Sequence, residues 1–284
     1  MDDVIDLGCS IALVGCLALV LGSHAVASVA AGRILAAKRV EREQGLPVVG
    51  KAPMHAVYRA LVPLARALVA LRVSANAVTL ISIVLAVCAA IAFGYGRLGV
   101  GAVVACASAL ADALDGMVAR ESGTASRAGR ILDTTVDRYV DALLLGGLAV
   151  HVRADAALLV LVLAAIVGSF MVSYASSVER ELGVTESPAV VPMRRAHRLA
   201  YLLTGATLGP LAAQVAGKGT PNGGLFPILV AAFAIAVLGN VSAIRRLAAV
   251  ARAEPTAGPP APAPDSHPTE VDHAAPPVSE GARR

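Results

Sequence analysis

Long runs without a charged residue dominate the pattern of hydrophobic and polar positions along the chain. Five such runs contain 19 to 26 residues each: 7–32, 73–96, 156–178, 199–217 and 219–244. A helix needs roughly 20 apolar residues to cross the hydrocarbon core of a membrane, so each run is long enough. Two further spans, over about 98–118 and 131–152, must include a stretch rich in aspartate. The pattern therefore predicts seven membrane-spanning helices.

A different pattern occupies residues 52–71. Apolar side chains recur there at a spacing of three or four, and Arg59 and Arg66 fall between them: Val57, Leu61, Leu64, Leu68 and Leu71. This spacing predicts an amphipathic helix lying on the inner membrane surface. In "VSANAVTL", which follows, Ser74 or Asn76 is placed to cap the start of the next span.

The ends of the chain are predicted to lie outside the main membrane domain. The first run resembles a signal peptide in position, but its leading segment "MDDVID" is acidic and its apolar stretch is long, which favours a retained helix. Eight of the sixteen prolines follow residue 254, which predicts a disordered cytoplasmic tail. We expect an extra N-terminal transmembrane helix (1–33), a polar connector (34–51), a membrane domain (52–250) and the tail (251–284).

The composition agrees with an all-α integral membrane protein that has a six-helix transmembrane core. Hydrophobic residues make up 57% of the chain and charged residues 15%, against about 45–50% and 25% in soluble domains. The apolar residues are mostly Ala, Val and Leu, which favours closely packed helices. The four cysteines lie inside predicted spans without the spacing of a metal site, so we interpret them as packing residues.

Loop charges predict the orientation in the cell membrane. Basic residues gather between spans on one side, whereas the opposite side has only Arg97, Arg153 and Lys218. The excess of basic residues marks the cytoplasmic side, where it would also attract anionic membrane lipids. No basic stripe is interleaved with aromatic residues, so the charge pattern argues against nucleic-acid binding.

Five of the eleven aspartates fall within thirty residues on this cytoplasmic side. Asp112 and Asp115 are three residues apart at the end of one span, Asp133 and Asp137 are four apart at the start of the next, and Asp141 follows one turn later. These spacings place each pair on one helix face. An antiparallel hairpin would therefore bring four carboxylates together near the inner interface.

Charged side chains inside a spanning segment are costly and point to function. Four neighbouring carboxylates would repel one another, and a hard divalent cation held by oxygen ligands relieves that repulsion. No Cys or His accompanies them, which argues against zinc. One alternative is a divalent-cation transporter, but that function requires acidic residues nearer the bilayer midplane.

The whole stretch reads D-x2-D-G-x2-A-R-x8-G-x3-D-x3-D and resembles the signature of the CDP-alcohol phosphotransferase (CDP-alcohol phosphatidyltransferase) family. The fixed positions are Asp112, Asp115, Gly116, Ala119, Arg120, Gly129, Asp133 and Asp137. Before the first core helix, family members often have S-P-N-x-x-T, where this chain has "SANAVT" with Ala75 in place of the proline. Because every position of the aspartate signature is intact, a degenerate, non-catalytic scaffold is disfavoured.

The resemblance implies a cytoplasm-facing active site with two Mg²⁺ or Mn²⁺ ions on the diphosphate of a CDP-linked lipid such as CDP-diacylglycerol. Asp112, Asp115 and Asp133 would be metal ligands, and Asp137 a ligand or the catalytic base. The nucleotide would lie against three small residues and one arginine: Gly116, Ala119, Gly129 and Arg120. An alcohol acceptor would then attack the lipid-linked phosphorus and release CMP. The family also implies a homodimer.

The acceptor is less clearly indicated. "SYASSVERELG" and "MRRAHRL" resemble segments that bind the acceptor phosphate in phosphatidylinositol phosphate and phosphatidylglycerophosphate synthases, which makes Arg180, Arg195 and Arg198 acceptor-binding candidates. Ser176 and Val178, however, occupy positions that are usually basic. A phosphorylated polyol is expected, and a non-phosphorylated or lipid acceptor is the alternative. For Asp141, pairing with Arg138 or another basic residue competes with a catalytic role.

Overall fold

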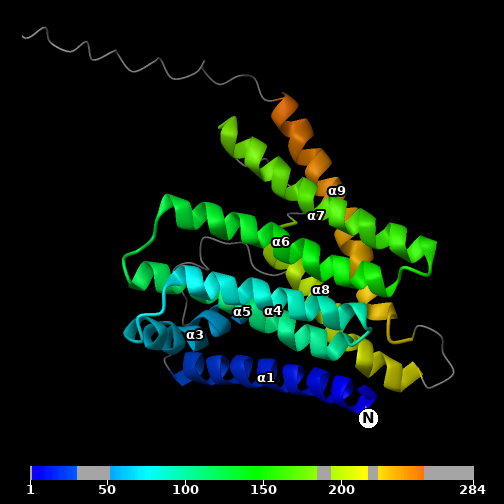
Figure 1. The fold of residues 1–284 in the computed structure, drawn as a ribbon, viewed down its shortest axis with the longest axis horizontal. Helices are drawn as coiled ribbons and strands as arrows, with labels where there is room; N and C mark the ends of the chain where they lie inside the picture. The colour runs from blue at the N-terminus through cyan, green and yellow to red at the C-terminus, as the bar shows by residue number, and fades with distance from the viewer. Residues whose placement is uncertain (1, 31–51, 184–192, 217–222, 253–284) are drawn as a thin grey trace, which may run out of the picture.

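The computed structural model describes residues 2–30, 52–183, 193–216 and 223–252, and every regular element in these ranges is an α-helix. The helices are α1 (Asp2–Ala30), α3 (Ala52–Ala70), α4 (Ala75–Gly94), α5 (Leu98–Glu121), α6 (Arg127–His151), α7 (Ala156–Glu181), α8 (Arg195–Ala216) and α9 (Phe226–Arg252). Figure 1 shows α4, α5 and α6 side by side, with α1 along one edge and α7 and α9 at the other. The predicted connector and the predicted tail beyond residue 252 lie outside the described residues, whereas residues 251 and 252 complete α9.

Six of the described helices are long and apolar enough to cross a membrane: α1, α4, α5, α7, α8 and α9. α6 is 25 residues long and packs against α4 and α7, but its first half carries the aspartates and arginines that lower its hydropathy. Many large apolar side chains point outward from the bundle, including Leu80, Val160 and Phe233. The prediction of an all-helical, multi-pass membrane protein is confirmed.

Small residues set the close approach of the helices. Gly147 of α6 lies directly against the backbone of Ala90 in α4, and a Cβ atom at Gly147 would overlap it. A Cβ at Gly239 of α9 would come within 3.1 Å of the backbone of Gly168 in α7. Such contacts are typical of membrane helices, which gain packing energy by letting backbones approach. The abundance of alanine and glycine in the sequence serves this packing.

The amphipathic helix predicted over residues 52–71 corresponds to α3. Its buried side chains Leu61 and Ala65 pack with Val78 of α4 and Leu114 of α5, whereas its arginines stay exposed. Leu64 is 48% exposed although it belongs to the same apolar series. α3 therefore contacts the bundle with one part of its apolar face and leaves another part open, as a helix at a membrane surface would.

α1 packs against α3, α5 and α8. Near its start, the buried side chain of Asp6 accepts a hydrogen bond of 2.9 Å at Oδ1 from the backbone N–H of Val100, in the first turn of α5. Gly99 lets the two backbones meet there, since a Cβ at this position would overlap Asp6 and Ser10. The first helix is thus built into the bundle beside the beginning of α5.

Candidate metal centre

A short turn joins the two helices that carry the aspartates. α5 ends at Glu121, and Gly123 follows with φ of +69°, a left-handed conformation that glycine adopts without strain. Ser126 caps α6, because its Oγ accepts a 3.0 Å hydrogen bond from the N–H of Gly129. α4 packs against both α5 and α6, so the three helices hold the aspartate stretch in place.

Three of the four predicted carboxylates gather in one cluster. Asp112 of α5 and Asp133 and Asp137 of α6 each offer a carboxylate oxygen, and these oxygens lie within 4.8 Å of one another. Within the described residues, the buried Oδ1 of Asp112 has no hydrogen-bond partner. An unpaired oxygen among converging carboxylates fits a hard cation such as Mg²⁺ or Mn²⁺, which is bound through oxygen.

Asp115 lies apart from this three-carboxylate cluster. Its side chain is 5% exposed, and its Oδ2 accepts a 2.6 Å hydrogen bond from the Oγ1 of Thr79 in α4. Thr79 is the last residue of "SANAVT", and the predicted cap Ser74 begins the same helix by accepting from the N–H of Ala77. The two sequence motifs thus meet in space, an association that their separation of 36 residues had not indicated.

Arg195, the first residue of α8, reaches into the cluster. Its Nη1 lies 2.7 Å from Oδ2 of Asp112 and 2.6 Å from Oδ1 of Asp137. Its Nε is 4.0 Å from Oδ1 of Asp141. One guanidinium therefore bridges acids of α5 and α6, although the sequence resemblance had suggested this arginine only as an acceptor-binding candidate.

Asp141 is ion-paired with a basic residue, one of the two alternatives for it in the sequence, and this partner is not the neighbouring Arg138. Arg198 of α8 places Nη2 2.7 Å from Oδ2 of Asp141, and Ser169 of α7 donates to the same oxygen at 2.9 Å. Arg198 is only 4% exposed and also donates to Ser173 at 3.4 Å. This buried network joins α6, α7 and α8 next to the cluster.

The remaining acceptor candidate, Arg180, is exposed and bonds within its own helix, donating from Nε to the carbonyl of Ser176 at 3.0 Å. A second arginine, Arg246 of α9, donates to Oγ of Ser176 at 3.2 Å and pairs with buried Glu179 at 2.7 Å. Arg246 was not predicted, because 67 residues separate it from Glu179 and no local pattern links them.

The residues expected to meet the nucleotide lie along the end of α5 and the start of α6. Gly116 and Ala119 are partly buried in the last turns of α5, near exposed Arg120, and Gly129 is in the first turn of α6.

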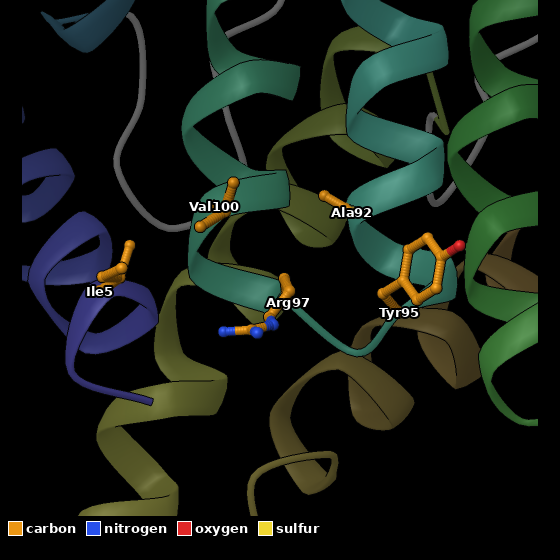
Figure 2. A pocket seen from close by; sticks show the side chains of 5 residues that line it. All are labelled: Ile5, Ala92, Tyr95, Arg97 and Val100. Atoms are coloured by element: carbon orange, nitrogen blue, oxygen red, sulfur yellow. The ribbon is translucent and has the colours of Figure 1, made fainter. Parts of the chain in front are cut away.

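A separate hollow at the opposite end of the bundle is lined by Ile5, Ala92, Tyr95, Arg97 and Val100. Figure 2 shows Arg97 as its charged member, with Ile5 of α1, Ala92 of α4, Val100 of α5 and, between α4 and α5, Tyr95. None of the clustered acids borders this hollow.

Comparisons with known proteins agree with the geometry. Residues 72–241 match the family CDP-alcohol phosphatidyltransferase. The chain is 34% identical over 166 residues to the phosphatidylinositol phosphate synthase of Mycobacterium tuberculosis, covering 57% of this chain and 74% of that one. It is 33% identical over 136 residues to the archaetidylinositol phosphate synthase of Pyrococcus horikoshii, covering 47% and 69%.

Two solved structures resemble the fold. One is the crystal structure of the phosphatidylinositol phosphate synthase of Mycobacterium tuberculosis with CDP-DAG bound, with a TM-score of 0.58 and 28% identity over 68% of this chain and 94% of that one. The other is the same synthase in complex with manganese and citrate, with a TM-score of 0.58 and 28% identity over 67% and 88%.

Proposed function

Because the chain belongs to the CDP-alcohol phosphatidyltransferase family, we propose that it transfers a phosphatidyl group from a CDP-linked lipid to the hydroxyl of a small phosphorylated polyol. CDP-diacylglycerol is the proposed donor, since a similar synthase is known with CDP-DAG bound. The observation that carries the proposal is the convergence of Asp112, Asp133 and Asp137, all three in the family's aspartate signature.

The three clustered acids, together with Asp115, would hold two divalent ions. When bound, such ions would neutralise the diphosphate and stabilise the departing CMP. Manganese in the structure of a similar synthase supports this choice of metal. All the donor atoms in the cluster are carboxylate oxygens, which suits Mg²⁺ and Mn²⁺ equally well.

Asp137 is the proposed base. It lies one turn further along α6 than Asp133 and belongs to the same cluster. Its carboxylate would take the proton from the acceptor hydroxyl while that oxygen bonds to the phosphorus next to the lipid. The bond from this phosphorus to the oxygen of CMP breaks in the same displacement, and CMP departs with its negative charge. Positioning of the two substrates contributes most of the remaining acceleration.

Inositol phosphate is the proposed acceptor. The names of the similar proteins from Mycobacterium tuberculosis and Pyrococcus horikoshii favour it over glycerol phosphate. On this chain, Arg195 and Arg198 enter from α8 beside the acids and are the candidates to bind its phosphate. The absence of basic residues at Ser176 and Val178 favours α8 over α7 as the source of this charge.

We place the acid cluster at the cytoplasmic face of the cell membrane, as the positive loops indicate. Asp6 and the first turn of α5 then lie at the outer face. A homodimer remains a prediction from the family.

The test is CMP release by the purified full-length protein from CDP-diacylglycerol, with a panel of acceptors that includes inositol phosphate, glycerol phosphate, inositol and serine. We expect release with inositol phosphate and Mg²⁺ and none in excess EDTA. Exclusive use of an unphosphorylated alcohol or of a second lipid would contradict the acceptor. Undiminished release in EDTA would contradict the role of the metal.

A further inference from the structure

Arg195 contacts two of the three carboxylates that the cluster would offer to a cation. A single nitrogen, Nη1, lies within hydrogen-bonding distance of Asp112 on α5 and of Asp137 on α6. Both acids belong to the group whose oxygens converge within 4.8 Å. A guanidinium bridging these two carboxylates and a divalent cation bound to them would repel each other at close range. The two positive partners therefore compete for Asp112 and Asp137.

The bridge leaves hydrogen-bonding capacity unused on both sides. Oδ1 of Asp112 and Nε of Arg195 are buried, and neither has a hydrogen-bond partner among the described residues. The unused oxygen is an acceptor that suits a metal ion, and the unused N–H is a donor that suits an anion. The bridge therefore satisfies these groups only in part. A metal ion can replace Arg195 at the carboxylates, and an anion can replace the carboxylates at Arg195.

The surroundings give Arg195 another position close by. Nε of Arg195 already lies 4.0 Å from Oδ1 of Asp141. Arg198, three residues along α8, is held by Asp141 and Ser173 and is almost fully buried. Arg198 can therefore anchor the start of α8 while the side chain of Arg195 leaves Asp112 and Asp137.

We propose that Arg195 is an exchangeable counter-ion that neutralises Asp112 and Asp137 until a divalent metal replaces it, and that the released guanidinium then binds the phosphate of the acceptor. The binding of the acceptor phosphate by Arg195 rests on the proposed function, whereas the exchange of Arg195 for a metal ion concerns only this chain and that ion. The exchange couples the two sites: metal binding strengthens acceptor binding, and by thermodynamic linkage acceptor binding strengthens metal binding.

The first arm of the test measures the affinity for Mn²⁺ alone, by the paramagnetic resonance of free Mn²⁺, in the purified full-length protein without substrates. Arg195→Gln removes the competing charge and should tighten Mn²⁺ binding about tenfold or more, the scale of a charge-assisted hydrogen bond. Arg195→Lys keeps a positive charge and should remain within about threefold of wild type. Arg66→Gln, in an exposed pair with Glu121 at 3.6 Å, changes the net charge equally and should have no effect.

An Arg195→Gln protein that binds Mn²⁺ as wild type does, or more weakly, overturns the exchange, because a merely structural bridge would loosen the cluster when removed. A melting curve verifies that this variant is folded, and Arg195→Met, which also removes the charge, provides the same comparison if it is not.

The second arm measures inositol phosphate binding by calorimetry with and without Mn²⁺. Wild type should bind it at least tenfold more tightly with Mn²⁺, and Arg195→Gln should lose that coupling. Coupling that persists in Arg195→Gln overturns the proposal that the released Arg195 binds the acceptor phosphate. If neither protein binds inositol phosphate, the proposed acceptor and the proposed binding of its phosphate by Arg195 both fail. The Mn²⁺ measurement still decides whether Arg195 and the metal exchange.

Discussion

Acidic side chains lie near both ends of α5, and the two groups differ in the hydrogen-bond partners of their carboxylate oxygens. At its beginning, Asp6 of α1 is 8% exposed and accepts a hydrogen bond from the N–H of Val100. Towards its end, Asp112 shares one guanidinium with Asp137 and retains an unpaired buried oxygen.

The difference separates structure from function. The first N–H groups of a helix have no partner within it, so a carboxylate placed there satisfies the backbone and interacts favourably with the helix dipole. Asp6 is such a cap, supplied by a neighbouring helix. A buried carboxylate oxygen without a donor instead destabilises a fold unless a ligand joins it. The clustered end of α5 is therefore where a cation is needed.

The largest expected effect is at the clustered end. Asp137→Asn retains the shape of the side chain and one oxygen that can contact a metal but cannot accept a proton. Turnover should fall on the order of a hundredfold, within the range for a general base, while CDP-diacylglycerol still binds. Steady-state CMP release and equilibrium lipid binding measure the two quantities. Normal turnover in this variant would place the base elsewhere.

A smaller effect is expected one turn along α5, where Asp115 has a matched donor. Thr79→Val keeps the shape but removes the hydroxyl that donates to Asp115 at 2.6 Å. A hydrogen bond to a charged group contributes about 1.5–3 kcal/mol, so the variant should melt at a lower temperature and lose activity. Thr79→Ser, which retains the hydroxyl, is the matched control. Equal melting of Thr79→Val and wild type would show that the contact contributes little.

The smallest effect is expected at the capped end. Asp6→Ala removes the cap from α5 and should cost about 0.5–2 kcal/mol of stability, whereas Asp6→Asn keeps an acceptor oxygen and should cost less. Because Asp6 is remote from the cluster, the Mn²⁺ affinity should not change. A loss of Mn²⁺ affinity in a folded Asp6→Ala protein would remove the distinction between the two ends.

The sequence predicted most of the fold because membrane helices depend on local composition. The five uncharged runs located α1, α4, α7, α8 and α9, and the two spans expected around the aspartates correspond to α5 and α6. Ser74 caps α4 as expected. Spacing alone also brought Asp112, Asp133 and Asp137 together, since the α5–α6 turn is short. The helix pattern, the aspartate signature and the family comparison therefore agree.

Long-range partners could not be predicted in the same way. Arg195 is 83 residues from Asp112, and Arg198 is 57 residues from Asp141. These pairs depend on how α8 packs against the bundle, and many arginines on the predicted inner side had equivalent local patterns. The sequence could therefore predict only that Asp141 pairs with Arg138 or another basic residue, and tertiary packing selects Arg198.

The central claim, that the clustered acids bind a divalent cation and the capped acid does not, is tested most directly by an Mn²⁺ titration of wild type, Asp112→Asn and Asp6→Asn. Mutations of residues that merely support a metal ligand already weaken binding about 10–100-fold, so Asp112→Asn should lose at least that much. Wild type and Asp6→Asn should each bind two Mn²⁺ ions, and the affinities of the variant should equal those of wild type. Equal Mn²⁺ binding by Asp112→Asn and wild type would contradict the account.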